Sequence, residues 1–248
     1  MNRRPWFREL IVGGLAAVGV TLASPLLRRW YNRWGATDSE LAQPLPGDDL
    51  VRHPKLSYTR AITIDAPPED VWTWLVQFGQ GRGGFYSYDA VENIIGCDIH
   101  STDRILPQHQ HLATGDVIRS GGRDTYPCWV VMDVDPPHAL VLQGAGTPEK
   151  VEIPDVVDEV PDRGYVASTW QWILRPAEGG RHTRLLVRQR TTYSPNQAIL
   201  WHLVEPLNFV MERKMLLGLK ARAEATADRT GPELPDTFEE LPVRFPTS

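Results

Sequence analysis

Residues 97–103 (CDIHSTD) form the densest group of titratable side chains in this sequence of 248 residues. His100, close to two acids, has the chemistry of a general acid or base or of a metal ligand. A metal site needs a third or fourth ligand in fixed geometry, which the spacing does not supply, so we expect no metal. Cys97 lacks a third group that would orient a base toward it. His100 and Asp98 are therefore the candidates for catalysis, and turn capping by Asp98 and Asp103 is the structural alternative.

Residues 81–88 (GRGGFYSY) combine glycines, one arginine and three aromatic rings. They lack the strand-GxGxxG-helix setting and the GK[ST] ending of phosphate-binding loops, so we interpret them as an ordinary loop. Arg82 has two interpretations: it holds an anionic head group at a cavity mouth, or it pairs with a nearby carboxylate. The hydroxyls of Tyr86 and Tyr88 suit the orientation of a mainly apolar ligand. The rings suit packing of the loop onto a sheet equally well.

These side chains must be positioned by a sheet and a few helices. A strand is expected at residues 57–65, and a helix at 69–78 places Val71, Trp74, Leu75 and Phe78 on one apolar face. A short helix follows at 90–95. From residue 115 the hydrophobic period changes to two, which predicts strands at 116–119, 127–135, 139–143, 165–174 and 183–193. Residues 177–180 (AEGG) join the last two strands as a hairpin.

Side chains alternate between two faces along strands 165–174 and 183–193. We expect one face of each strand to point into the domain and the arginines of the second strand to lie in water. The inward set contains Trp170, Trp172, Leu185, Val187, Gln189 and Thr191, and the outward set contains Arg184, Arg188 and Arg190. Gln189 and Thr191 favour a cavity there, because buried polar groups need partners.

The chain closes with helical sequence after Ser194 and Pro195, an N-cap residue followed by a proline at the first helical position. Pro206 interrupts the pattern, so we expect one helix ending near residue 205 and a longer one from there to about 229. Met211 and Met215 on the longer helix face the tryptophans of the sheet. They form either an adaptable cavity wall or plain core.

Residues 10–27 (LIVGGLAAVGVTLASPLL) carry no charge and are flanked by arginines and aromatic residues. A run of this length and flanking predicts a single membrane-spanning anchor. The alternative is a cleaved export signal, although no clean cleavage site follows. Arginines lie on both sides, so the positive-inside rule does not give the orientation. Residues 35–54 are a linker or an irregular lead-in, and residues 231–248 are a proline-rich tail.

The composition of the chain bears on which classes of partner and cofactor it can bind. The net charge is −5 and no basic stripe marks a folded segment, which argues against nucleic acid. Cys97 and Cys128 have no zinc-type spacing; they are either two isolated small residues or, in an exported domain, a pair. No motif for haem, flavin or nicotinamide occurs, so we expect no cofactor.

Four segments carry a family resemblance: RAITIDAPPEDVWTWLVQFGQGRGGFYSYDAVENIIGCDIHSTDRI, STWQWILRP, TRLLVRQRT and FVMERKMLLGLKARAE. They resemble the SRPBCC superfamily of actinobacterial type, START-like proteins that include polyketide cyclases/dehydrases and lipid-transport-like members. The resemblance covers about residues 56–229. It implies an α+β helix-grip fold, in which a twisted antiparallel sheet wraps around a long C-terminal helix with a cavity between them. The domain plan is then an anchor with flanks at 1–34, a linker at 35–54, the helix-grip domain at 55–230 and the tail at 231–248.

The expected function is membrane-associated binding of a hydrophobic or lipid-like small molecule in that cavity. The candidate ligand-binding residues are Arg82, Tyr86, Tyr88, Trp170, Trp172, Gln189, Thr191, Met211 and Met215. One alternative is a cyclase/dehydratase-type enzyme that uses His100, Asp98, Tyr86 and Tyr88 in the same cavity. A second alternative is a cavity-poor interaction domain at the membrane.

Overall fold

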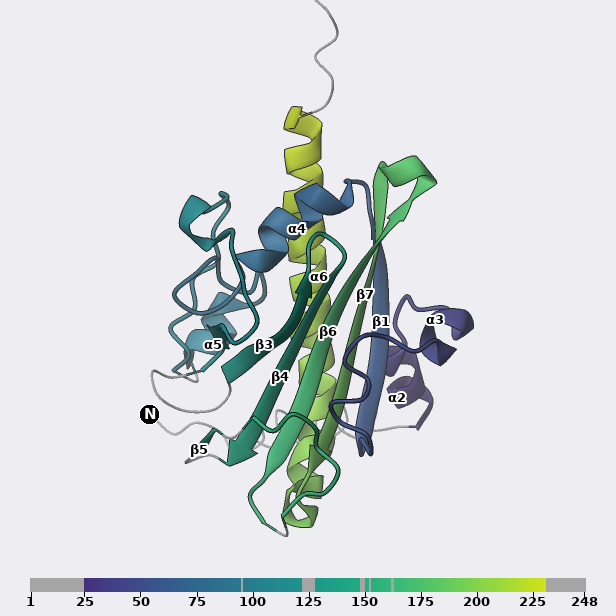
Figure 1. Ribbon diagram of the computed structural model, residues 1–248, viewed down its shortest axis with the longest axis vertical. Coiled ribbons are helices and arrows are strands. Elements are labelled where there is room, and N and C mark those ends of the chain that lie inside the picture. Colours follow the sequence, from purple (N-terminus) through teal and green to yellow (C-terminus); the bar gives the residue numbers. More distant parts are fainter. Residues whose placement is uncertain are drawn as a thin grey trace, which may run out of the picture.

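The computed structural model describes residues 25–94, 96–121, 128–147, 150–151, 153–161 and 163–230. The predicted anchor up to residue 24 and the tail 231–248 lie outside the described residues. Among the described residues, no helix has the length and hydrophobicity needed to cross a membrane. The fold is α+β: one antiparallel sheet wraps around a single long helix, which is the helix-grip arrangement (Figure 1).

The sheet has seven strands in the order β1-β7-β6-β4-β3-β2, with the short β5 beside β4. The predicted strands are confirmed to within a few residues at their ends, and β4 continues four residues beyond its predicted end. The β6–β7 hairpin pairs Val166 with Tyr193 and Ala177 with His182 at its two ends. The strands are β1 (Leu56–Ile64), β2 (Val117–Arg119), β3 (Cys128–Asp135), β4 (Ala139–Thr147), β5 (Lys150–Val151), β6 (Val166–Ala177) and β7 (His182–Tyr193).

Helix α6 (Ala198–Thr230) is continuous through Pro206, so the predicted break at this proline is wrong. A proline inside a helix removes one hydrogen bond and costs about 3 kcal/mol. Tertiary contacts on both sides of Pro206 offset that cost, because Glu205 and Phe209 are both buried against the rest of the domain. The short 3-10 turn η3 (Pro195–Gln197) leads into the helix, as the Ser-Pro start predicts.

The main core lies between α6, helix α4 (Pro68–Val76) and the inner face of the sheet. The tryptophans of β6 and Leu185 and Val187 of β7 belong to it, which confirms the predicted inward face of the hairpin. Helix α5 (Asp89–Ile94) and the 3-10 turn η1 (Pro107–His109) lie in the connection between α4 and β2. A further 3-10 turn, η2 (Glu178–Gly180), closes the β6–β7 hairpin.

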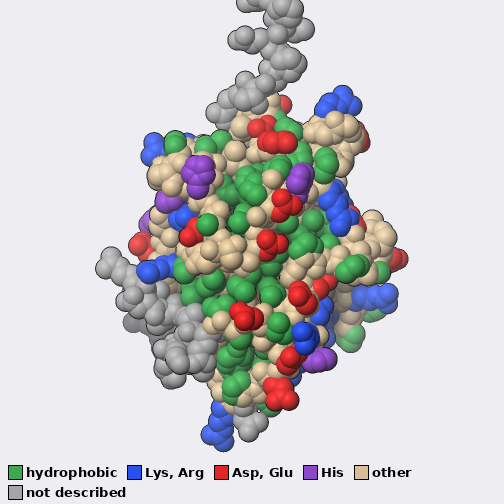
Figure 2. Space-filling model, in the orientation of Figure 1, with side chains coloured by type: hydrophobic (Ala, Val, Ile, Leu, Met, Phe, Trp, Pro, Cys, Tyr) green, Lys and Arg blue, Asp and Glu red, His purple; other side chains and the backbone are tan. Residues whose placement is uncertain are grey.

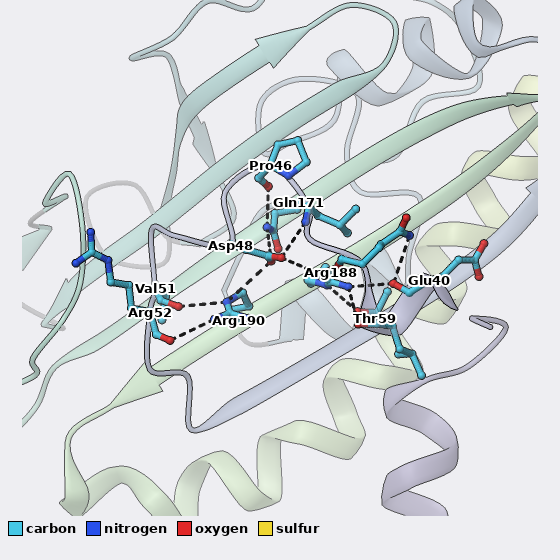
Figure 3. A network of polar contacts seen from close by, with 12 residues as sticks. Glu40, Pro46, Asp48, Val51, Arg52, Thr59, Gln171, Arg188 and Arg190 are labelled. Atoms are coloured by element: carbon cyan, nitrogen blue, oxygen red, sulfur yellow. Dashed lines mark hydrogen bonds and ion pairs between the residues drawn. The ribbon is translucent and has the colours of Figure 1, made fainter. Parts of the chain in front are cut away.

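The outer face of the sheet is covered, and the prediction that the β7 arginines lie in water is wrong. Residues 35–54, with the short helix α3 (Asp38–Ala42), run across this face (Figures 1 and 3). Arg188 is only 4% exposed and donates to Asp48 Oδ2 at 2.7 Å and to Thr59 Oγ1 at 2.9 Å. Its guanidinium also donates to backbone carbonyls of residues 40, 41 and 43. The irregular lead-in therefore packs on the sheet through a buried arginine.

Charge is distributed unevenly over this side of the molecule. Figure 2 shows acidic side chains across the middle of the face and most lysines and arginines toward its edges.

The other two β7 arginines also contact the lead-in. Arg184 is held by the Glu40 carboxylate at 2.8 Å, and Arg190 donates to the Val51 and Arg52 carbonyls. The arginines predicted to be solvated therefore attach the lead-in instead.

Helix α2 (Pro25–Asn32) begins inside the predicted anchor run 10–27, includes the last three residues of that run and packs on α6. Tyr31 is buried and stacks on Phe209 with ring centroids 5.6 Å apart. Arg28 Nε donates to Glu205 Oε1 at 2.9 Å. The end of the predicted anchor run and the flank that follows it are thus part of the folded body.

Candidate functional site

A cavity of about 210 Å³ lies between α6, the α5 region and the inner face of the sheet. It is smaller than the ~300–1,000 Å³ of ordinary ligand pockets and is partly open to solvent, so it suits a small molecule or one end of a longer one. Most of its wall is apolar, with a few carboxyl, amide and hydroxyl groups. The wall consists of Phe85, Ser87, Glu92, Cys97, Ile99, Ser120, Trp129, Trp170, Gln189, Asn208, Met211, Glu212 and Met215.

Three aromatic rings line the cavity, two from the sheet and one, Phe85, from the loop 81–88. The Trp129 and Trp170 centroids are 5.2 Å apart, and Phe85 lies 6.3 Å from Trp170. Trp129 comes from β3 and Trp170 from β6, so the pairing of strands through β4 brings them together. Met211 and Met215 face the cavity from α6, and their flexible thioethers can adapt to an apolar ligand.

A buried polar cluster fixes one end of this wall. Glu212 of α6 accepts hydrogen bonds from Trp170 Nε1 and from the Tyr58 hydroxyl, each at 3.0 Å. Arg60 of β1 pairs with the other carboxylate oxygen and also donates to the Tyr31 carbonyl at 3.0 Å. Burial and the neighbouring carboxylate raise the pKa of Tyr58 well above its usual range, so this tyrosine stays protonated. The cluster thereby orients the Trp170 ring that faces the cavity.

Glu92 of α5 is the least satisfied polar group in the wall. Within the described part of the chain its buried Oε2 atom has no hydrogen-bond partner. Burial, and then repulsion from Asp89, raise the pKa of this carboxyl to about 7. Asp89 is held by the backbone N–H and hydroxyl of Ser101 at 2.6 and 2.7 Å. A carboxyl that is half-ionised near neutral pH and faces a cavity is suited to binding a ligand or exchanging a proton with it.

The two cysteines are both free thiols. Cys97 lines the cavity, and burial raises its pKa, followed by the charge of Glu92. The thiolate is the reactive form of cysteine, so these surroundings make Cys97 a poor nucleophile. Cys128 at the start of β3 also has its pKa raised by burial.

Four of the predicted ligand-binding residues meet in the wall: Trp170, Gln189, Met211 and Met215. Trp172 and Thr191 are buried but lie outside it. The Trp172 ring contacts Trp170 at 5.0 Å, and the Thr191 hydroxyl is hydrogen-bonded to Ser168 at 2.9 Å. Both therefore support the wall from behind.

The predicted loop residues lie elsewhere. Arg82 donates to the Val76 carbonyl at 2.8 Å and to the His109 carbonyl at 3.3 Å. Tyr86 is buried, and its hydroxyl donates to the Trp74 carbonyl at 2.9 Å. Tyr88 is half-exposed beside a surface groove that Trp30 and Trp34 also line. The structure thus places these three side chains outside the wall of the cavity.

The two candidates for catalysis lie on the surface. His100 and Asp98 contact each other at 3.2 Å with side chains 79% and 77% exposed, and neither is part of the cavity wall. Asp103 pairs with Arg222 of α6. Among the described residues, no group of three or more His, Cys, Asp or Glu side chains is arranged to hold a metal ion.

Sequence reasoning missed Glu92, Trp129, Asn208 and Glu212. The signal for Glu212 is its position, because it lies three residues after Phe209 and three before Met215 on the buried face of α6. A charged residue on an apolar helix face indicates a buried ion pair or a functional group. Arg60 gives the same signal on β1, between the inward-facing Tyr58 and Ile62. No comparable signal marks Glu92, which belongs to a six-residue helix.

Comparison with known proteins gives no family. No family model and no curated protein matches the chain. The hypothetical protein jhp0584 from Helicobacter pylori is 12% identical, with a TM-score of 0.42 over 73% of this chain and 96% of that one. A conserved protein from Geobacillus kaustophilus is 13% identical, with a TM-score of 0.41 over 69% and 97%. CalU16 from Micromonospora echinospora is 15% identical, with a TM-score of 0.29 over 69% and 86%. At TM-scores below 0.5 nothing about function follows from these likenesses.

Proposed function

We propose that this chain is a membrane-associated protein of the SRPBCC type that binds a hydrophobic or lipid-like small molecule between α6 and the sheet. The observation that carries the proposal is the cavity itself. Three aromatic rings and two methionines provide the apolar wall, and a few polar groups provide orientation. Empty apolar space costs stability in a core, so its retention beside a fixed polar cluster favours a ligand. The cavity counts against a cavity-poor interaction domain.

The enzyme alternative would need residues other than the ones predicted for it. His100 and Asp98 are exposed and outside the wall, so they are poorly placed for chemistry on a bound molecule. A cyclase or dehydratase reaction in this cavity would depend on Glu92, whose pKa near 7 suits proton transfer. Ligand binding needs only the cavity, whereas catalysis also needs a reacting group near Glu92. We therefore place binding first.

The binding proposal predicts that the full chain, extracted from its host membrane in a mild detergent, carries a hydrophobic molecule that native mass spectrometry detects. Cys97→Phe should abolish the adduct, because a ring at this wall position fills a large part of the cavity. Cys97→Ser conserves the side-chain size and should keep the adduct. Circular dichroism checks that both variants fold. A wild-type protein that carries no adduct and does not take up the neutral probe N-phenyl-1-naphthylamine would count against the proposal.

Membrane association is supported by two features. The first is the uncharged run 10–27, flanked by arginines and aromatic residues. The second is an exposed apolar row on α6, at the spacing i, i+4, i+8 and i+11, which is one face of the helix. Large aliphatic side chains rarely form such rows on a surface unless something covers them. The row consists of Ile199, Leu203, Leu207 and Val210, and α2 adds the exposed Leu26 and Trp30.

A bilayer with anionic head groups is the occupant that fits this apolar row. Residues 25–27, the end of the anchor run, belong to α2, and α2 is packed on α6, so a bilayer that holds the earlier part of the run would lie beside the row. The exposed Arg29 on α2 and Arg213 and Lys214 on α6 border it. Basic side chains beside inserted apolar ones are typical of surfaces that bind anionic lipids.

The membrane contact predicts lipid cross-links from the row. The full chain would be reconstituted in vesicles of phosphatidylcholine and phosphatidylglycerol, with a benzoylphenylalanine in place of Leu203. Lipid adducts should form there and be few when the probe replaces Val117, which is exposed on β2, the edge strand opposite β1. Cross-links from position 203 to residues 1–24 or to a second copy would assign the row to a protein contact instead. Failure of the full chain to sediment with vesicles would contradict membrane association altogether.

A further inference from the structure

The charged side chains among the described residues of the cavity wall are all acidic. Among the described wall residues there are two carboxylates, Glu92 and Glu212, and no lysine, arginine or histidine. Arg60 approaches Glu212 from behind the wall and balances its charge. No such partner reaches the buried Oε2 atom of Glu92 within the described part of the chain. Asp89 adds a second negative charge next to it. The uncompensated charge that a ligand would meet is therefore negative.

The remaining wall favours the same sign of charge. The faces of aromatic rings are negative, and tryptophan attracts cations most strongly. Trp129 and Trp170 pack against each other at 5.2 Å, and Phe85 completes the cluster. A carboxylate ligand would have to lose its hydration in a space that already holds two carboxyl groups and no cationic side chain, which is unfavourable. A protonated amine would meet aromatic rings and a carboxylate oxygen that has no partner among the described residues.

We propose that the cavity selects a small molecule with an apolar body and a protonated amino group, and excludes fatty acids and other carboxylates. The amino group pairs with Glu92, and the apolar body packs against Phe85, Trp129 and Trp170. This inference rests on the proposed function, which is that the cavity binds an apolar or amphipathic molecule. It adds the chemical class of that molecule.

The proposal predicts that the affinity for an amine depends on pH. The ionised form of Glu92 binds a cation better, and its pKa of about 7 in the free protein means that this form increases from pH 6 to pH 8. An alkylamine stays protonated throughout this range, so its affinity should rise by about tenfold, whereas that of an alcohol should not. The other titratable groups facing Glu92 are Asp89, Cys97 and, across the cavity, Glu212. Burial raises the pKa of Cys97, so its thiol stays neutral in this range.

The test compares three probes of equal shape that dissolve in water: 4-phenylbutylamine, 4-phenylbutan-1-ol and 4-phenylbutanoate. Isothermal titration calorimetry measures their affinity for the full chain in nanodiscs of zwitterionic lipid. At pH 7.5 the amine should bind at least about tenfold more tightly than the carboxylate, with the alcohol between them. Glu92→Gln should weaken amine binding by about tenfold and remove its pH dependence, with little effect on the alcohol. Asp98→Asn removes the same charge from an exposed site and should change none of these values.

The outcomes separate the two proposals. If the carboxylate binds as tightly as the amine, or if Glu92→Gln leaves amine binding unchanged, the cavity binds apolar molecules but the inference about their charge is wrong. If none of the three probes binds, the proposed function and the inference both fail. A preference for the amine that Glu92→Gln removes and Asp98→Asn leaves intact supports both.

Discussion

Replacing Arg60 with methionine is expected to lower the free energy of unfolding by about 3–5 kcal/mol, as loss of one partner of a buried ion pair does. Arg60 is fully buried and Glu212 nearly so, and the two form a direct ion pair. Methionine fills a similar volume but leaves the Glu212 carboxylate without a cation. It also removes the donor to the Tyr31 carbonyl, which helps to hold α2 on the body. Urea unfolding, followed by tryptophan fluorescence, measures the loss.

Two further variants test the cause of this loss. In Arg60→Met/Glu212→Leu no charge is left unpaired, so the double variant should recover much of the stability lost in Arg60→Met. Arg52 and Asp158 form an exposed ion pair at 3.3 Å. Arg52→Met removes this pair and should lower the free energy of unfolding by less than about 1 kcal/mol. An Arg60→Met variant that loses no more than Arg52→Met would show that the buried pair is not important for stability. Restored folding with reduced ligand uptake in the double variant would indicate that the pair serves the cavity.

The predictable parts of this protein follow local rules. Alternation along β6 and β7 predicts that Trp170 and Gln189 face inward, and helical spacing predicts the same for Met211 and Met215. These four residues line the cavity because an element's period fixes the direction of each side chain. No such period exists in the loop 81–88, where residue types alone made Arg82 and Tyr86 candidates. Tyr86 has a φ of 57°, a left-handed conformation that its sequence context does not reveal.

The predictions that failed depended on contacts between distant segments. Pro206 breaks a helix when only local costs count, but α6 continues because residues on both sides of the proline pack against the body. The arginines of β7 alternate with apolar residues, which is typical of a solvated face. The lead-in 35–54 has no periodicity to indicate that it covers this face. A buried charge can be recognised from sequence only when its own element is regular, as for Arg60 on β1.

Arg188→Met is therefore expected to detach the lead-in and to lower the free energy of unfolding by about 3 kcal/mol, because a buried ion pair loses its cation. The Arg188 guanidinium bridges the Asp48 carboxylate, the Thr59 hydroxyl and three backbone carbonyls of the lead-in (Figure 3). These carbonyls would lose their charged donor, which costs more than loss of an ordinary surface contact. Amide hydrogen exchange at residues 37–51 should accelerate, whereas exchange in β4 and in α6 should change little.

The conservative variant Arg188→Lys distinguishes charge from geometry. Lysine keeps the positive charge, but its single ammonium group cannot reach a carboxylate, a hydroxyl and three carbonyls at once. We therefore expect Arg188→Lys to retain part of the stability and to show intermediate exchange at 37–51. If Arg188→Lys matches the wild type, charge neutralisation of Asp48 alone holds the lead-in. If even Arg188→Met leaves exchange at 37–51 unchanged, apolar contacts such as that of Leu45 with Leu186 and Ile173 hold the lead-in, and the arginine is not needed for it.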